Sequence, residues 1–274
     1  MPILTKASIK SLAEQLPAIS PAALHLVSLI DNPRTTREQL VEMISTDQTI
    51  LAQCFKQANS VAMGFNREYK SLEAVVDVMG FSHIRKVGLF VAAKSIIEDP
   101  MVWFESVFLA VASQYVARKS GRNSVDIDKV YIAALFLNYG SYFFKQFYPG
   151  IYANIQSTND FALRMQQERG EFGFTFPEVS AIILATYEIP DSILDIIRAQ
   201  EFVYQEDASK ENVSIEIARL MFNLQDADAG AIRARLDIKE VRRLVAGHGL
   251  PILDIDQESI QNIKVDTRDY ANIN

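Results

Sequence analysis

The spacing of apolar residues constrains the fold of this chain more than any other feature. Nearly every segment repeats apolar side chains at intervals of three or four residues, as an amphipathic helix does. No segment alternates apolar and polar residues convincingly with the period of a half-buried strand, and no strand–turn–strand signal occurs. We therefore predict an all-α protein made of many helices.

Local signals mark where individual helices begin and end. Ser20 can cap a helix that begins at Pro21 and stops at the Asp-Asn-Pro sequence of 31–33. In the next helix a capping box can form between Thr35 and Glu38 or between Thr36 and Gln39. The other main helices are predicted over 71–80, 84–97, 103–121 and 126–147, after each of Pro149, Pro177 and Pro190, and over 214–224, 238–246 and 259–263.

Composition narrows the class of protein. Apolar residues make up 49% and charged residues 22% of the 274 residues, which is typical of a globular protein. The formal net charge of −7 disfavours a general nucleic-acid binder and a protein of anionic membranes. Cys54 is the only cysteine, so the chain can form neither an internal disulfide nor a zinc cluster, which favours a reducing compartment. Because no signal peptide or membrane-spanning run is found either, we expect a cytoplasmic protein.

Four short segments near the start of the chain occur in a characteristic order. They are Leu-Pro-Ala-Ile-Ser-Pro at 16–21, the stretch that ends in Gln-Ala-Asn-Ser at 51–60, Gly-Phe at 64–65, and Ser-Leu-Glu-Ala-Val-Val-Asp-Val-Met-Gly at 71–80. This order resembles the HDOD domain, a bacterial signalling module related to the HD metal-dependent phosphohydrolases. The resemblance extends over roughly 16–205. It implies one HDOD-type unit, with an N-terminal helical lobe at 1–98 and a degenerate HD-like lobe with a C-terminal helical extension at 99–274.

The resemblance also predicts where an HD hydrolase would hold its metals. Such enzymes use histidine and aspartate side chains on successive helices to bind divalent ions that activate water. Here the corresponding positions carry Glu105, Leu137, Asn138, Phe176, Gln200 and Glu201. No histidine lies between His83 and His248, so a shift of one residue in the alignment restores no ligand. We expect no catalytic residue, no metal and no cofactor.

The former metal cleft is expected to persist as a concavity that is either filled or able to accept a small ligand. Leu137, Tyr139 and Phe176 replace charge with volume, which predicts a cleft drier and narrower than that of a hydrolase. Glu105 with the amide side chains at 138 and 200 would supply its few polar groups.

Asn59 and Ser60 end an apolar helix, and two interpretations stay open for them. Their side chains can terminate the helix by bonding nearby backbone. The resemblance implies instead a polar anchor that holds the two helical groups against each other. The loop that follows contains Phe65 and Tyr69 among few charges, and it is either a docking surface or, if it tucks under the second lobe, part of the core between the lobes.

A second candidate docking surface is basic. Lys239, Arg242 and Arg243 lie at helical spacing, with Arg235 one turn earlier. A solvated helix face and a docking site for an acidic partner are both compatible with this pattern. Nucleic acid is disfavoured by the net charge.

The resemblance implies a non-catalytic regulatory or scaffolding protein in bacterial signal transduction, which acts through protein–protein contacts. A homodimer is one of the assemblies left open. Two other functions remain alternatives: a metal-dependent phosphohydrolase with a rearranged site, and a small-molecule sensor that uses the old metal cleft.

Overall fold

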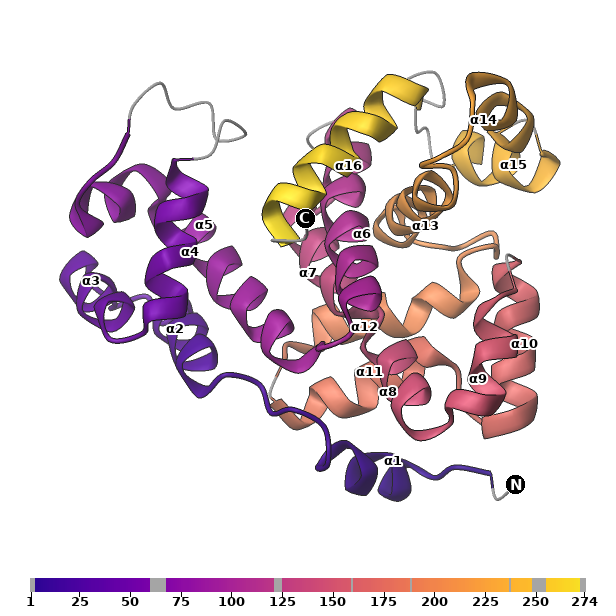
Figure 1. Ribbon diagram of the computed structural model, residues 1–274, viewed down its shortest axis with the longest axis horizontal. Coiled ribbons are helices and arrows are strands. Elements are labelled where there is room, and N and C mark those ends of the chain that lie inside the picture. The colour runs from indigo at the N-terminus through magenta and orange to yellow at the C-terminus, as the bar shows by residue number, and fades with distance from the viewer. Residues whose placement is uncertain are drawn as a thin grey trace. The chain divides into compact units, whose positions relative to one another are not determined.

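The computed structural model describes residues 3–59, 68–120, 125–158, 160–187, 189–236, 238–247 and 255–271. Every regular element within these residues is a helix, which confirms the predicted all-α class (Figure 1). Among them no helix is long and apolar enough to cross a bilayer. The chain forms two compact units, a smaller one at Pro17–Glu98 and a larger one that combines Met1–Leu16 with Asp99–Asn274.

The smaller unit contains α2 (Pro21–Asp31), α3 (Arg37–Ser45), α4 (Gln48–Ala58) and α5 (Leu72–Ile96). Helix α5 contacts each of the other three. The cap predicted at Ser20 is confirmed, because its Oγ accepts a hydrogen bond from Ala23 N at 3.2 Å. Of the two predicted capping boxes, the one between Thr36 and Gln39 forms.

Helix α5 agrees with the prediction of a helix that ends at Gly80 and a second helix after it. The range of α5 contains two helical segments that meet at a kink at Gly80, and the second begins earlier than the predicted residue 84. The backbone of Gly80 has φ +65° and ψ 170°, a conformation that glycine adopts without steric cost. Glycine therefore interrupts the helix as expected, and the chain resumes helical geometry directly after it.

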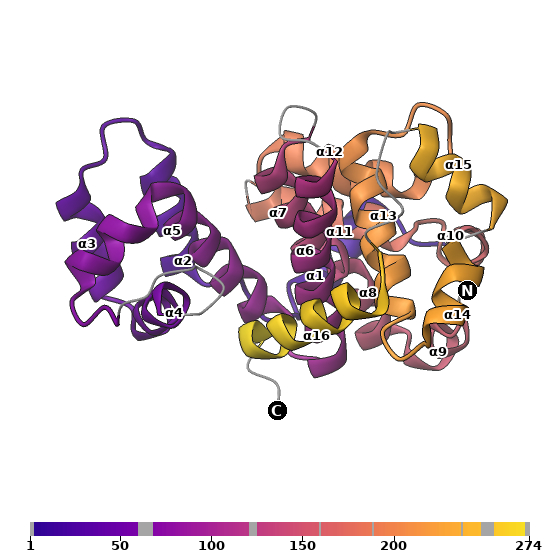
Figure 2. The same cartoon turned by 90° about the horizontal axis from the view of Figure 1, so that it is seen from above.

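The larger unit is built around α6 (Pro100–Lys119), which contacts α7 (Ile127–Leu137), α13 (Lys210–Asn223) and α16 (Gln257–Ala271); Figure 2 shows these helices side by side. Trp103 on α6 is completely buried, and its Nε1 donates a hydrogen bond to the carbonyl of Ala271 at 3.2 Å. The remaining elements are α1 (Lys6–Ala13), α8 (Tyr139–Phe147), α9 (Pro149–Gln156), α10 (Phe161–Phe172), α11 (Phe176–Leu184), η2 (Ala185–Tyr187), α12 (Asp191–Ala199), η3 (Gln200–Phe202), α14 (Ala229–Leu236) and α15 (Lys239–Gly247).

The first sixteen residues belong to the larger unit, whereas the sequence prediction grouped them with the segments that follow. The amide of Leu4 donates a hydrogen bond to the carbonyl of Phe172 at 2.9 Å, and α1 contacts α11. Gly173, with φ +79°, makes room for this segment, because a Cβ there would lie 2.4 Å from Cγ2 of Ile3. Long-range contacts of this kind leave no local signal in the sequence.

Several helices of the larger unit differ from the prediction. The helix expected over 126–147 is divided at Asn138, whose φ of −79° and ψ of 3° are not helical, into α7 and α8. Helices α1, α10 and α14 were not predicted. Helix α16 is longer than the predicted 259–263, because Ile260, Ile263, Thr267 and Ala271 continue one buried face along it.

Candidate functional site

The positions aligned with the metal ligands of HD hydrolases all lie in the larger unit. Glu105 is on α6, Leu137 and Asn138 are at the junction of α7 and α8, Tyr139 begins α8, Phe176 begins α11, and Gln200 and Glu201 lie in η3. Leu137, Asn138, Tyr139, Phe176 and Gln200 are at most 2% exposed. These positions are therefore filled by packed side chains.

A buried ion pair on α10 contacts one of these positions. The side chains of Arg164 and Glu168 are 10% and 0% exposed, and Nε of Arg164 donates a hydrogen bond to Oε1 of Glu168 at 3.0 Å. The other carboxylate oxygen of Glu168 accepts a hydrogen bond from the backbone N–H of Phe176 at 2.7 Å. The Arg164 guanidinium lies 4.4 Å from the centre of the Phe176 ring. Glu168 thus holds the first residue of α11 in place.

Two further helices bond to the same pair. Arg164 donates hydrogen bonds to Oγ of Ser141 on α8, at 2.6 Å, and to the hydroxyl of Tyr152 on α9. That hydroxyl donates in turn to Oε1 of Glu168 at 3.1 Å. The pair therefore bonds to α8, α9 and α11 at once.

A second buried ion pair lies on α13. Arg219 donates to Oε2 of Glu216, and their side chains are 10% and 0% exposed. The guanidinium of Arg219 stacks 3.5 Å from the centre of the Phe161 ring, at the start of α10. The hydroxyl of Tyr204 donates a hydrogen bond to the other oxygen of Glu216. Both oxygens of this carboxylate are therefore engaged.

Glu105 lies within the electrostatic reach of both arginines. Burial raises the pKa of its carboxyl, while Arg164, Arg219, Asn138 and Lys145 act in the opposite direction. With Glu168 and Glu216, three carboxylates interact with the two guanidiniums, and we call these five residues the buried charge cluster, although Glu105 itself is half-buried. The cluster carries one excess negative charge when all five side chains are ionised, and burial raises the pKa of both Glu105 and Glu168, which favours removing that charge by protonation.

The residues present do not fit a bound transition metal. Within the described part of the chain no group of three or more histidine, cysteine, aspartate or glutamate side chains is placed to hold one. Glu168 and Glu216 already accept hydrogen bonds from guanidinium, hydroxyl or backbone donors on both of their oxygens. A divalent ion would have to displace a guanidinium and would be repelled by it.

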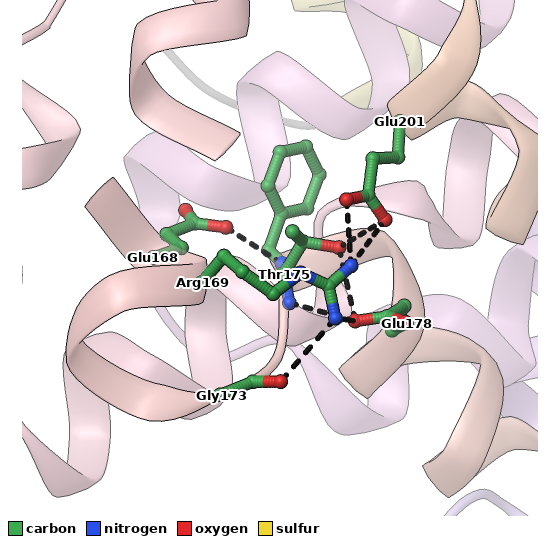
Figure 3. A network of polar contacts seen from close by, with 7 residues as sticks. Glu168, Arg169, Gly173, Thr175, Glu178 and Glu201 are labelled. Atoms are coloured by element: carbon green, nitrogen blue, oxygen red, sulfur yellow. Dashed lines mark hydrogen bonds and ion pairs between the residues drawn. The ribbon is translucent and has the colours of Figure 1, made fainter. Parts of the chain in front are cut away.

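A more exposed network surrounds Arg169, the neighbour of Glu168 (Figure 3). Its guanidinium bonds to both oxygens of Glu201, at 2.6 and 2.7 Å, and reaches Oε2 of Glu178 at 2.8 Å. Thr175 Oγ1 donates to Glu201 at 3.2 Å, and Thr175 N donates to Glu178 at 3.0 Å. Glu201 thus joins η3 to the first turn of α11 through Arg169 and Thr175.

Close packing of α8 against α11 completes the site. A Cβ at Gly140 would lie 2.0 Å from the carbonyl oxygen of Phe176, and Gly140 N donates to Oγ of Ser180 at 2.6 Å. Among the predicted polar groups, Gln200 accepts a hydrogen bond from Nδ2 of Asn212 at 3.0 Å. Buried nitrogen Nε2 of Gln200 and Nδ2 of Asn138 have no hydrogen-bond partner in the described residues.

The other predicted residues lie away from the buried charge cluster. Asn59 ends α4 in the smaller unit, and its Oδ1 accepts from Tyr69 N at 2.7 Å while its Nδ2 donates to Tyr69 O at 3.2 Å. These bonds join the end of α4 to backbone ten residues further along the chain, and both interpretations of Asn59 stay predictions. Ser60 and Phe65 lie outside the described residues.

The basic residues predicted at helical spacing, Lys239, Arg242 and Arg243, share α15 and are exposed. Arg235, one turn earlier in sequence, lies on α14. Arg243 forms an ion pair with Glu206.

The arginines and glutamates of α10 and α13 were also missed as site residues. Their i,i+4 and i,i+3 spacing is typical of exposed ion pairs. A signal was present, however, because Glu168 falls on the same helical stripe as Phe161, Met165 and Phe172, all of which are buried.

Comparison with known proteins identifies the family. The HDOD domain model matches residues 16–203. Among solved structures, the "Putative phosphohydrolase" of Shewanella amazonensis SB2B is 16% identical with a TM-score of 0.70, over 97% of this chain and 96% of that one. An HDOD domain protein with unknown function from Geobacter sulfurreducens is 16% identical with a TM-score of 0.69, over 97% and 99%.

A third structure, the "Putative signal transduction protein" of Marinobacter aquaeolei VT8, is 17% identical with a TM-score of 0.66, and the match covers 100% of this chain and 61% of that one. No curated protein matches the sequence. These structures share the fold at low sequence identity, and the domain match covers more than half of the chain. This chain belongs to the HDOD domain family.

Proposed function

We propose that this protein is a non-catalytic regulatory or scaffolding component of bacterial signal transduction, acting in the cytoplasm through contacts with other proteins. The observation that carries the proposal is the buried charge cluster. Where an HD hydrolase needs open carboxylate and imidazole ligands, this chain has two carboxylates that are each hydrogen-bonded to an arginine, and one of them also accepts from the backbone N–H of Phe176.

The chemistry of the cluster supports a structural role for these side chains. Hydrolysis of a phosphoester by an HD-type site needs a metal that holds both the substrate and the attacking water. A guanidinium is a permanent cation without a vacant coordination position, so it can neither lower the pKa of a bound water nor exchange ligands. The burial of Asn138, Phe176 and Gln200 also argues against the old cleft as a sensor site.

Partner binding is assigned to the exposed basic face of α15. Lys239, Arg242 and Arg243 project from this helix, while Val241 and Leu244 on its other side are buried. Charged residues of one sign at the edge of an interface steer an oppositely charged partner toward it and affect the association rate. We therefore expect an acidic protein surface as the partner, and a second copy of the chain is the simplest alternative.

A charge-reversal experiment tests this assignment. The double variant Lys239→Glu/Arg242→Glu should lose partners captured from the native bacterial lysate, as measured by quantitative mass spectrometry. The matched control Lys6→Glu/Lys10→Glu makes the same change in net charge on α1 and should retain them. Equal retention by both variants would rule out α15 as the docking surface, and light scattering of the wild type would reveal a dimer.

The enzyme alternative has its own test. Purified protein should hydrolyse bis-p-nitrophenyl phosphate no faster than buffer in the presence of Mn²⁺, Mg²⁺ or Zn²⁺. Turnover that requires metal and disappears in Glu105→Ala or Glu201→Ala would contradict the non-catalytic proposal.

A further inference from the structure

A pocket of about 530 Å³ lies in the larger unit. None of the positions of the old metal cleft lines it, although the ring of its lining residue Phe161 packs against Phe176. Its walls come from the start of α10, the segment after η3, and helices α14 and α15. Phe161, Val241 and Leu244 are among its apolar lining residues. A volume of this size matches the range of small-molecule sites, roughly 300–1,000 Å³.

The charged groups of this pocket differ in whether another group of the protein already bonds to them. The carboxylate of Asp160 caps α10 by accepting from Leu163 N at 3.0 Å, and Glu206 forms an ion pair with Arg243. The guanidinium of Arg235, which is half-buried, makes no hydrogen bond or ion pair within the described residues. The pocket therefore presents one cation whose charge no neighbouring carboxylate in the described part of the chain balances.

We propose that this pocket binds a small amphipathic anion, with a body of aromatic or aliphatic carbon and one carboxylate or phosphate group that pairs with Arg235. A guanidinium matches the geometry of both groups, since it donates two parallel hydrogen bonds to paired oxygens. The rings of Phe161 and Tyr204 offer surface for an apolar body. This site shares Arg243 with the α15 face assigned to a protein partner, but Lys239 and Arg242, which carry the charge-reversal test, do not line it, so each proposal can fail without the other.

Two residues of the pocket contact members of the buried charge cluster. Phe161 lines the pocket and lies against the guanidinium of Arg219, and Tyr204 lines the pocket and donates to Glu216. Arg235 is close enough to Tyr204 to affect its hydroxyl electrostatically. An anion that neutralises Arg235 would therefore act on a hydroxyl that is bonded to the cluster.

The test uses 8-anilinonaphthalene-1-sulfonate, a fluorescent aromatic compound with one anionic group. The wild type should bind it saturably, and Arg235→Gln should weaken binding about tenfold, because a hydrogen bond between charged groups contributes roughly that factor. Arg198→Gln removes the same charge from an exposed ion pair on α12 and should bind as the wild type does. N-phenyl-1-naphthylamine, which lacks the sulfonate, should bind Arg235→Gln and wild type equally.

Two further measurements establish whether the dyes bind in the pocket itself. Ala162→Phe, at an exposed position on α10 that lines the pocket, should weaken both dyes by filling space while the melting temperature stays unchanged. The small anions 2-naphthoate and phenyl phosphate should displace the sulfonate dye from the wild type.

The proposal is overturned if Arg235→Gln binds the sulfonate dye as tightly as the wild type, or if Arg198→Gln loses as much affinity as Arg235→Gln. It is also overturned if Ala162→Phe leaves both dyes unaffected. Displacement by a glutamate-rich peptide but by neither small anion would assign the pocket to a protein partner and refute the small-molecule proposal.

Discussion

Removing Arg164 tests how the buried charge cluster contributes to folding. In Arg164→Met the carboxylate of Glu168, which is 0% exposed, loses its guanidinium and keeps only the hydroxyl of Tyr152 and the backbone N–H of Phe176 as donors. Breaking a buried ion pair by removing one partner costs about 3–5 kcal/mol. For a unit of this size such a loss lowers the melting temperature on the order of 10 °C.

The assay is urea unfolding followed by circular dichroism, with Arg198→Met as the matched control. Arg198 also pairs with a carboxylate on its own helix, Asp195 at i,i+3 spacing, but the two side chains are 43% and 70% exposed, so the control should lose less than about 1 kcal/mol. Restoring neutrality with Arg164→Met/Glu168→Gln should recover at least half of the loss, because an amide oxygen can still accept from Phe176 N. If Arg164→Met is no less stable than Arg198→Met, the pair does not hold the fold as argued.

Acid should partly rescue the single variant. Burial already raises the pKa of Glu168 in the wild type against the opposing effect of Arg164, so removing Arg164 lifts the folded-state pKa further above that in the unfolded state. A group with a raised folded pKa binds more protons in the folded state, and stability falls as pH rises. The gap between Arg164→Met and the wild type should therefore narrow from pH 8 to pH 5, and a gap independent of pH would contradict this explanation.

Three further predictions follow from individual residues. Because burial raises the pKa of Glu105, wild-type stability should decline as pH rises above the usual carboxyl range. Glu105→Gln removes that decline, so the urea midpoint of the variant should increase relative to that of the wild type between pH 5 and pH 8. Gly140→Ala places a Cβ 2.0 Å from the carbonyl oxygen of Phe176 and should destabilise the protein by about 3 kcal/mol or more. In the control Gly170→Ala the Cβ meets nothing within 4 Å, so the variant should stabilise α10 by roughly 0.5–1 kcal/mol. Equal urea midpoints for the two variants would refute the close contact at Gly140. Burial raises the pKa of the Cys54 thiol to about 12, so Ellman's reagent at pH 8 should modify this residue only after urea unfolding, and rapid modification of the folded protein would show that the thiol is accessible.

Local chemistry made part of this fold predictable from the sequence. The caps at Ser20 and Thr36, and the start of α7 at Asp126, depend on side chains within three residues of the backbone that they bind. The resemblance to the HDOD family could be recognised from the sequence because the segments that carry it are short and contiguous. The packing of residues 3–16 on the larger unit was not, because it depends on contacts across more than 150 positions of sequence.

Only part of the candidate site could be predicted from the sequence, because the buried residues that distinguish it are charged. A pattern of apolar residues locates buried helix faces, and Arg164 and Glu168 count against α10 in such a pattern although both are buried. Conversely, the aligned positions Leu137, Asn138 and Phe176 lie in the larger unit but show only which metal ligands the site lacks. What replaces the metal ligands became visible only when α10 and α13 were placed next to Glu105.

The buried charge cluster has a consequence for how a ligand could act on this protein. On the proposal of an anion at Arg235, the ligand and the cluster are linked through Tyr204, whose hydroxyl donates to Glu216, and through Phe161, which lies against Arg219. If the arrangement of the cluster changes the binding free energy of the ligand, ligand binding must change the free energy of that arrangement by the same amount. Helices α6, α10 and α13 all contribute charges to this cluster, so a ligand that alters the bond between Tyr204 and Glu216 would bias the packing of these three helices together.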